Sequence, residues 1–309
     1  MIDNLIDGLK KKNIISISKL ISFIENNSAE SSIINNAIFP LINNSYRIGI
    51  TGPPGAGKST ITNLLIKHFR KLKKSVAVLL VDPSSPFTGG ALLGDRIRMN
   101  MHYEDSSVFI RSIATRGSKG GLSISSNEIA DILDAAGFDI IIFETVGVGQ
   151  IEVDVVEQVD TVVLTLVPES GDDIQMMKAG IIEIADIFLI NKSDRKDSDK
   201  LYTALENMLS ISKVESLWKP KIIKTIATKD EGIDILVKEL LNHNNLISDS
   251  KNKFDKLNKR YINKIDSLLV EQIKNKFWTE ENIQNLNNEL KKNPNKRLSP
   301  IKLVNKLYK

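Results

Sequence analysis

A short glycine-rich stretch holds the residues most clearly suited to chemistry. Residues 52–59 read GPPGAGKS, which matches the pattern G-x-x-x-x-G-K-[ST], and they lie between the apolar run RIGIT and the helical segment TITNLLIKHF. In such a loop, successive backbone N–H groups point at phosphate oxygens, and the following helix adds the positive end of its dipole. Lys58 is expected to reach the β- and γ-phosphates, and Ser59 to bind Mg²⁺ through its hydroxyl. The predicted phosphate-binding residues are Gly52, Pro53, Pro54, Gly55, Ala56, Gly57, Lys58, Ser59 and Thr60.

A second motif, later in the chain, has the residues that recognise guanine. Residues 191–194 read NKSD and end the apolar run DIFLIN. A carboxylate such as Asp194 accepts hydrogen bonds from the ring N–H and the exocyclic amine of guanine, which adenine does not offer. The tetrapeptide alone also fits a solvated loop, but its place at a strand end after a phosphate-binding loop favours GTP over ATP. Lys192 is expected along the base, and the loop after the next strand is expected to contact the guanine carbonyl through its backbone. The predicted base-binding residues are Asn191, Lys192, Asp194, Thr225, Ile226 and Ala227.

Two acidic residues at strand ends are candidates for the metal site. Glu144 directly follows the apolar run IIIF, where an acid without a function would be costly, and it can hold Mg²⁺ through a water molecule. The N–H of the nearby Gly147 can bond a γ-phosphate oxygen. Asp82 follows the run VAVLLV and is a second metal candidate, because ligands of α/β proteins bind at the carboxyl ends of the strands.

Composition excludes several other kinds of site. The 309 residues, 41% of them apolar, are enough to build a large core. There is no cysteine, which excludes disulfides, zinc–cysteine sites, iron–sulfur clusters and a cysteine nucleophile, and only three histidines, so a histidine-rich metal centre is not expected. No apolar run approaches the roughly 20 residues of a membrane span, and the N-terminus resembles no secretory or transit peptide. We therefore predict a soluble, cytoplasmic protein.

The net charge of +4 is unevenly distributed along the chain. Residues 251–309 carry 15 Lys and Arg against 6 Asp and Glu, so the remainder of the chain is slightly acidic. A basic C-terminal segment can contact nucleic acid, an anionic membrane or an acidic protein, or can simply be a solvated lysine face on helices. The last interpretation is the simplest one.

The elements that must position these motifs alternate between strands and helices. Seven short β-branched runs are separated by helical segments: RIGIT, SVAVLLVD, SVFIRSI, FDIIIFE, TVVLTLV, DIFLIN and KIIKTIA. Such runs predict an α/β P-loop NTPase fold, with a mostly parallel sheet and helices on both faces. We divide the chain into an N-terminal helical cap (1–45), a P-loop GTPase domain (46–248) and a C-terminal helical extension (249–309).

Both ends of the chain have the periodicity of amphipathic helices. Near the N-terminus, two groups of apolar residues repeat at i, i+3, i+4 and i+7, and a third follows before Pro40. In the C-terminal segment, steps of three and four residues describe one apolar stripe on a long helix, and Ser299-Pro300 predicts the start of a last one. The stripe is formed by Phe254, Leu257, Tyr261, Ile265 and Leu268. Because the segment offers little partner surface of its own, we expect it to pack on another chain or on the α/β domain.

The motifs, taken together and in order, resemble one family. GPPGAGKST, VDPSSPFTGGALLGDRIRM, ETVGVGQ, PESGDDIQMMKAG and NKSD are similar to the corresponding segments of the MeaB/ArgK family, the methylmalonyl-CoA mutase-associated GTPases. The resemblance is close over roughly residues 40–245. Related GTPases that deliver nickel carry cysteine or histidine metal motifs, which this sequence lacks.

The resemblance implies a GTPase that acts as a chaperone for an adenosylcobalamin-dependent acyl-CoA mutase. The chaperone role would cover cofactor loading, protection or reactivation, with GTP/GDP and Mg²⁺ as ligands. It implies a first switch at residues 82–99, with Asp82 and Asp95 near the metal, and a second switch at residues 144–150. It also implies a third switch at residues 169–178 that links nucleotide state to the partner. The polar members of that switch are Asp172, Asp173, Gln175 and Lys178. The C-terminal helices resemble the family's dimerisation arm, so a homodimer is expected.

Hydrolysis itself needs positioning and charge neutralisation more than covalent chemistry. The hypothesis assigns Lys58 to the phosphates, Asp95 or Gln150 to the attacking water, and counts Lys178 among the catalytic candidates. Four arginines are candidates for an arginine finger, but each is equally suited to a structural ion pair: Arg96, Arg98, Arg111 and Arg116. His68 lies more than two turns along the helix that follows the phosphate loop and is assigned no chemistry.

Two other functions fit parts of the sequence. One is a kinase or ATPase coupled to arginine/ornithine (LAO/AO) transport, against which the guanine-selecting NKSD motif argues. The other is a membrane-targeting GTPase whose basic C-terminal segment contacts anionic lipid, although no methionine-rich or strongly amphipathic targeting domain accompanies it.

Overall fold

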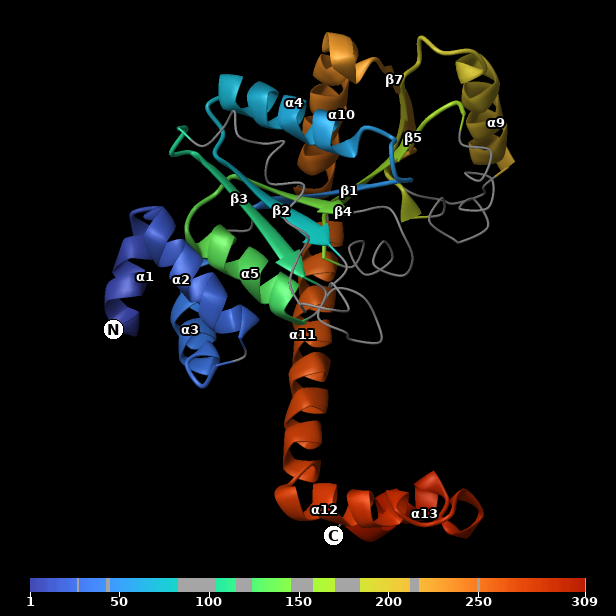
Figure 1. Ribbon diagram of the computed structural model, residues 1–309. Helices are drawn as coiled ribbons and strands as arrows, with labels where there is room; N and C mark the ends of the chain where they lie inside the picture. The colour runs from blue at the N-terminus through green and yellow to red at the C-terminus, as the bar shows by residue number, and fades with distance from the viewer. Residues whose placement is uncertain are drawn as a thin grey trace. The chain divides into compact units, whose positions relative to one another are not determined.

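Seven parallel strands form one sheet (Figure 1). Their order is β3-β2-β4-β1-β5-β6-β7, and every neighbouring pair is parallel. The strands are β1 (Tyr46–Thr51), β2 (Val76–Asp82), β3 (Val108–Ala114), β4 (Ile140–Thr145), β5 (Thr161–Leu166), β6 (Ile187–Asn191) and β7 (Lys221–Thr225).

In the computed structural model, the 309-residue chain falls into two units. The first is Met1–Lys253 and the second Phe254–Lys309. Within them, the structure describes residues 1–26, 28–42, 45–82, 104–114, 124–145, 158–169, 184–211, 217–248 and 251–308.

Alternate side chains of the central strands pack into opposite faces of the sheet. In β2, Val78 and Leu80 belong to one cluster of buried residues, whereas Leu79 and Val81 belong to another. Both clusters are apolar, as is typical of a parallel sheet that is covered on both faces.

Helices α4 (Lys58–Lys71) and α10 (Ile233–Ser248) cover the first face. The two helices pack against each other, and α4 also contacts β1, β2 and β4. Ile61, Leu65 and Phe69 of α4 are fully buried at helical spacing. Because burying each such side chain contributes about 1.5–3 kcal/mol, this stripe fixes the helix that follows the phosphate loop on the sheet.

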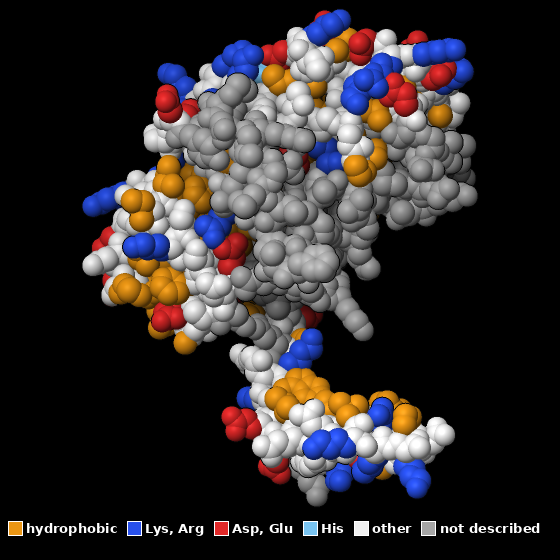
Figure 2. All heavy atoms as spheres, viewed as in Figure 1, with side chains coloured by type: hydrophobic (Ala, Val, Ile, Leu, Met, Phe, Trp, Pro, Cys, Tyr) orange, Lys and Arg blue, Asp and Glu red, His pale blue; other side chains and the backbone are white. Residues whose placement is uncertain are grey.

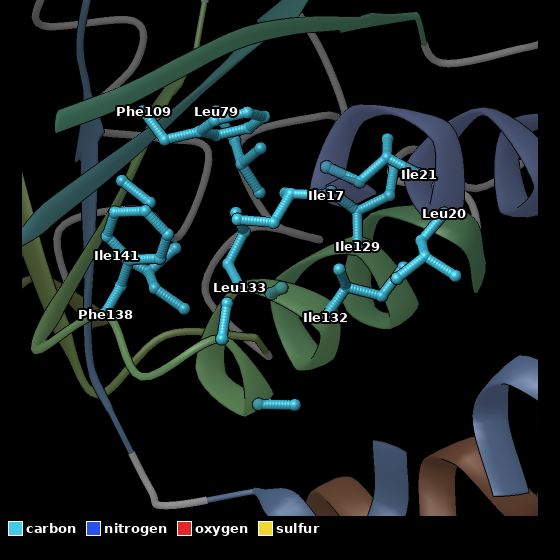
Figure 3. Packing of buried hydrophobic residues seen from close by; sticks show 14 of the residues in the cluster. Ile17, Leu20, Ile21, Leu79, Phe109, Ile129, Ile132, Leu133, Phe138 and Ile141 are labelled. Carbon is cyan, nitrogen blue, oxygen red and sulfur yellow. The ribbon is translucent and has the colours of Figure 1, made fainter. Parts of the chain in front are cut away.

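Helices from the N-terminus and helix α5 cover the opposite face. They are α1 (Ile2–Lys10), α2 (Ile14–Glu25), α3 (Ser31–Ile38), the short 3₁₀ turn η1 (Phe39–Leu41) and α5 (Ile124–Ala135). Figure 3 shows Ile17 and Ile21 of α2 in one cluster with residues of α5 and with Leu79 of β2. The N-terminal helices thus share a core with the sheet.

Helix α9 (Ser198–Ile211) closes a third, smaller cluster beside the β5–β6 end of the sheet. Leu205 of α9 is fully buried and belongs to one cluster with Leu164 of β5 and Phe188 of β6. This packing fixes the helix that begins shortly after the NKSD motif.

The second unit is helical. It contains most of α11 (Lys251–Phe277), then α12 (Glu280–Leu290), the 3₁₀ turn η4 (Pro294–Lys296) and α13 (Pro300–Leu307). The hydroxyl oxygens of Thr279 and Ser299 accept hydrogen bonds from backbone N–H groups in the first turns of α12 and α13, at 3.2 and 3.4 Å. The cap at Ser299 confirms the predicted start of the last helix, and the cap at Thr279 explains where α12 begins.

The predicted fold class is confirmed. All seven predicted strands are present and parallel, and helices cover both faces of the sheet. The predicted helices of both termini are also present. Over the described ranges, no helix combines the length and apolar character needed to cross a membrane.

Candidate nucleotide-binding site

The sheet topology brings three motifs to the same edge of the sheet, at the carboxyl ends of β4, β1 and β6. After β1 the chain crosses over β4 to β2, whereas after β4 it crosses over β1 to β5, so the direction of winding reverses around β1. Ligands of doubly wound α/β proteins bind at such a reversal. The phosphate loop follows β1, Glu144 lies near the end of β4, and Asn191 ends β6.

Two glycines let the phosphate loop approach its neighbours closely. Gly52 has a φ of 137°, and a Cβ there would lie 2.0 Å from the carbonyl oxygen of Thr165. Gly57 has a φ of 93°, and a Cβ there would lie 2.4 Å from Nδ2 of Asn191. Both positions therefore require glycine for conformation and for space.

Lys58 lies inside this loop. The residue is 7% exposed, and its Nζ donates hydrogen bonds to the carbonyl oxygens of Gly52 at 2.7 Å and Pro53 at 2.9 Å. Lys58 is also the first residue of α4, so the unsatisfied N–H groups of that helix begin here. The ammonium group and the helix dipole together place positive charge at the loop, which suits a phosphate.

Ser59 and Glu144 meet across the loop. The hydroxyl of Ser59 donates to Oε1 of Glu144 at 2.6 Å, and Glu144 is only 6% exposed. A hydroxyl and a carboxylate are hard oxygen ligands, which Mg²⁺ prefers, so this pair fits the ion. Within the described ranges, no three His, Cys, Asp or Glu side chains gather into a metal site. In NTPases, Mg²⁺ is bound mainly by phosphate oxygens and water and by only one or two protein groups. Ser59 and Glu144 can supply those protein groups.

Asn191 joins the guanine motif to the phosphate loop. Its Nδ2 donates to the carbonyl oxygen of Ala56 at 2.8 Å. Its Oδ1 accepts from the N–H of Ala227 at 3.1 Å and from the hydroxyl of Thr225 at 3.3 Å. The side chain is buried, so all three bonds form away from water. One amide thereby joins the end of β6 to the phosphate loop and to the end of β7 with the loop that follows it.

The remaining residues of the NKSD motif are less buried than Asn191. Lys192 has a left-handed backbone, with a φ of 55°, which costs a non-glycine residue about 1 kcal/mol. Its Nζ donates to the carbonyl oxygen of Gly55 at 2.9 Å, so the lysine lies over the phosphate loop. Asp194 is exposed, which leaves its carboxylate accessible to a base.

The loop after β7 is closed by its own backbone. Ile226 and Glu231 form an isolated antiparallel bridge, and Ala227–Lys229 form a 3₁₀ turn, η3, between them. Ala227 is the residue whose N–H is held by Asn191. The three residues predicted to contact the guanine carbonyl thus lie where β7 passes into this closed loop.

The structure brings together the predicted phosphate-binding and base-binding residues and Glu144. Several predicted residues lie outside the described part of the chain: Asp95, Gly147, Gln150, Asp172, Asp173, Gln175 and Lys178, together with Arg96, Arg98 and Arg116. Asp82 ends β2, and its side chain is likewise outside the described part. The remaining arginine candidate, Arg111, pairs with Glu25 and donates to Ser22 of α2. It is a structural link between β3 and the N-terminal helices.

Sequence reasoning missed the group that ties the closed loop to α4. Asp230 contacts both Lys67 and His68 of that helix. No motif marks these residues; the only hint is that Asp tolerates a left-handed turn just before a glycine.

Comparisons with known proteins agree on one family. A family model described as methylmalonyl Co-A mutase-associated GTPase MeaB matches residues 17–282. A protein of Pyrococcus horikoshii named as a GTPase is 48% identical over 272 residues, covering 87% of this chain and 86% of its own. GTPase ArgK of Escherichia coli is 40% identical over 214 residues, covering 67% of this chain and 63% of its own. The mitochondrial methylmalonic aciduria type A homolog of Mus musculus is 42% identical over 196 residues, covering 61% of this chain and 46% of its own.

A solved structure extends this likeness to the whole chain. The crystal structure of a protein described as LAO/AO transport system kinase has a TM-score of 0.72 and 26% sequence identity. It covers 99% of this chain and 96% of its own.

Proposed function

This chain belongs to the MeaB family of methylmalonyl-CoA mutase-associated GTPases, and on that premise we propose that its GTP hydrolysis serves an adenosylcobalamin-dependent acyl-CoA mutase. The observation that supports the site most directly is the contact of Asn191 with Ala56, which joins a guanine-selecting motif to a phosphate loop. The proposed role is that of a chaperone that governs cofactor loading, protection or reactivation of the mutase. The proposed setting is the cytoplasm.

The arrangement accounts for how GTP is held. The carboxylate of Asp194 accepts hydrogen bonds from the guanine ring N–H and amine, and Lys192 lies along the base. Lys58 and the backbone N–H groups of the phosphate loop bind the β- and γ-phosphates. Lys58 exchanges its bonds with two loop carbonyls for bonds with phosphate oxygens, which a flexible ammonium can do within the same small space.

The metal and the water complete the proposed site. Ser59 would hold Mg²⁺ directly and Glu144 through water, with Asp82 and Asp95 as further candidates, and the bound ion neutralises charge on the phosphates. Asp95 or Gln150 would orient the attacking water, and Gly147 would contact the γ-phosphate. Lys178 is a further catalytic candidate.

The proposed partner contacts divide between the switches and the second unit. Residues 169–178, with Asp172, Asp173, Gln175 and Lys178, would transmit nucleotide state to the mutase. A homodimer would form through the second unit, in which Glu289 and Leu307 alone are buried among the described side chains. Figure 2 shows hydrophobic side chains gathered over α12 and α13. Exposed apolar residues of this unit include Tyr261, Ile262, Leu269, Ile301 and Val304.

The test is GTP hydrolysis measured with and without an adenosylcobalamin-dependent mutase. We expect slow hydrolysis by the isolated protein and a clear acceleration when methylmalonyl-CoA mutase is added, because catalysis here depends on positioned groups that a partner can supply. Glu144→Gln should lower the Mg²⁺ affinity of the nucleotide complex and reduce both rates. If the isolated protein hydrolyses GTP rapidly and no mutase of this type changes the rate, the chaperone role is wrong.

A second candidate function is nucleotide hydrolysis coupled to arginine/ornithine transport. It is favoured by the likeness to the solved LAO/AO transport system kinase. An ATP-dependent kinase has no use for a carboxylate placed like Asp194, so competition between GTP and ATP for binding separates the two functions. Preference for ATP would favour the transport function.

A further inference from the structure

A closed loop follows β7 and carries one carboxylate at its corner. The N–H of Ile226 donates to the carbonyl oxygen of Glu231 at 3.1 Å, and the N–H of Glu231 donates back at 3.3 Å. Asp230 lies inside this closed loop, directly before Glu231, and has a left-handed backbone, with a φ of 60°. Gly232 follows at a φ of 78°, and a Cβ there would lie 2.3 Å from the carbonyl oxygen of Lys224. The loop therefore has one well-defined shape.

Both oxygens of that carboxylate are used by a single helix. Oδ2 of Asp230 lies 2.8 Å from Nζ of Lys67, and Oδ1 lies 2.8 Å from Nε2 of His68. The His68 side chain is 17% exposed, against 51% for Lys67, so the histidine contact is the better shielded of the two. Two neighbouring residues of α4 thus each contact the loop through one oxygen of Asp230.

The same helix begins, at its other end, directly after the phosphate loop. α4 begins at Lys58 and Ser59, and His68 lies nine residues after Ser59, which is roughly 14 Å along the axis at about 1.5 Å per residue. The loop is anchored from the opposite side by Asn191, which holds the N–H of Ala227. The position of Ala227 is therefore set by two anchors, one in the guanine motif and one on the phosphate-binding helix.

We propose that Asp230 is a positioning residue for guanine recognition: it anchors the loop 226–231 to α4, so that a backbone N–H of this loop meets the guanine carbonyl while the phosphates sit at the start of the same helix. The inference rests on the guanine site proposed above. Its consequence is that the distance between the base and phosphate subsites is fixed by α4 itself. Losing the anchor should weaken recognition of the guanine carbonyl and leave phosphate binding unchanged.

The test compares nucleoside diphosphates that differ only in the base. GDP and IDP both carry the carbonyl that the loop would contact, whereas ADP has an amine in its place, and IDP lacks the exocyclic amine that Asp194 would bind. Asp230→Asn keeps the size and the tolerance for a left-handed backbone but removes the charge. The double variant Lys67→Ala/His68→Ala removes the same contacts from the helix side, so a folding defect in either variant leaves the other as the test.

A matched control lies on the same helix. Arg70 of α4 pairs with Asp105, through Nε and Oδ2 at 2.7 Å, away from the guanine loop. Asp105→Asn therefore removes an ion pair of α4 without touching the proposed anchor.

We expect the affinities for GDP and IDP to fall together, about 3- to 10-fold, in both anchor variants, whereas the affinity for ADP stays the same. In the Asp105→Asn control, the affinities for all three nucleotides should equal those of the wild type. The GDP-to-ADP preference would then fall while the GDP-to-IDP preference stays constant. An unchanged GDP-to-ADP preference in both anchor variants would overturn this inference but not the proposed guanine site. A loss of ADP affinity equal to the loss of GDP affinity would have the same consequence, because it indicates a general structural effect. A wild-type protein without preference for GDP over ADP would overturn the guanine site and the inference with it.

Discussion

Gly57 and Asn191 lie so close together that there is no room for a methyl group on Gly57. A Cβ on Gly57 would lie 2.4 Å from Nδ2 of Asn191, the atom that donates to the carbonyl oxygen of Ala56. The last glycine of the phosphate motif and the first residue of the guanine motif therefore constrain each other.

Gly57→Ala is expected to abolish tight nucleotide binding. The new Cβ must displace Asn191, and the φ of 93° adds strain of its own. The control is Gly55→Ala, which shares the positive φ at 77° but has no atom within 4 Å of the added Cβ. GDP affinity measured by calorimetry should fall at least tenfold further in Gly57→Ala than in Gly55→Ala. Equal losses would show that backbone strain alone accounts for the effect.

Asn191→Ala should weaken both the fold and nucleotide binding. The substitution removes three buried hydrogen bonds and leaves the carbonyl oxygen of Ala56 and the N–H of Ala227 without this partner. Since an unsatisfied buried group costs about 1–3 kcal/mol, we expect the free energy of unfolding without nucleotide to fall by about 2–4 kcal/mol. Urea unfolding followed by circular dichroism measures the change. A loss below about 0.5 kcal/mol would mean that water replaces the amide.

Asp194→Asn should change which purine is bound. An amide in place of the carboxylate keeps an acceptor for the ring N–H but offers a donor where guanine carries its amine. Xanthine has a carbonyl at that position and accepts this donor. We expect GDP affinity to fall at least tenfold and XDP to become the better ligand, as competition with a fluorescent nucleotide would report. A variant that still prefers GDP would place the base elsewhere.

The anchor at Asp230 should also contribute to stability in a pH-dependent way. The hydrogen bond from Lys67, with a smaller contribution from His68, holds the pKa of Asp230 below its ordinary value. A carboxylate with a lowered pKa in the folded state stabilises the fold above its unfolded pKa of about 3.9, and this stabilisation is lost as the pH falls through the folded value. Besides these two groups on α4, the charged neighbours in the loop are Lys229 and Glu231.

The measurement compares wild type with Asp230→Asn in urea at several pH values. The stability difference should be present at about pH 5 and above and should shrink below about pH 4, since the wild-type carboxylate then takes up its proton. A difference that persists unchanged at pH 3 would mean that the charge contributes nothing and that only the shape of the side chain matters.

The strands and the phosphate loop could be predicted because their patterns are local. Each strand is a short, nearly continuous apolar run, and GPPGAGKS carries its own conformational requirement at Gly52 and Gly57. The cap at Ser299 is equally local, so the last helix of the second unit begins as expected.

The contacts that assemble the site could not be predicted, because they depend on the order of strands in the sheet. Asn191 reaches Ala56 across 135 positions, and Asp230 reaches Lys67 across 163. Nothing in the residues near Asp230 indicates which helix will face it. The N-terminal helices show the same limit: periodicity predicts them as a cap, but it does not reveal that Ile17 joins the core beneath β2.

That shared core decides which fragments of this chain can be studied. Ile17 and Ile21 of α2 lie in one buried cluster with Leu79 of β2 and Ile141 of β4 (Figure 3). A fragment that begins at β1 would expose the apolar residues of this cluster that the N-terminal helices cover, and a large exposed apolar patch leads to aggregation. The shortest nucleotide-binding fragment therefore has to keep α1 and α2.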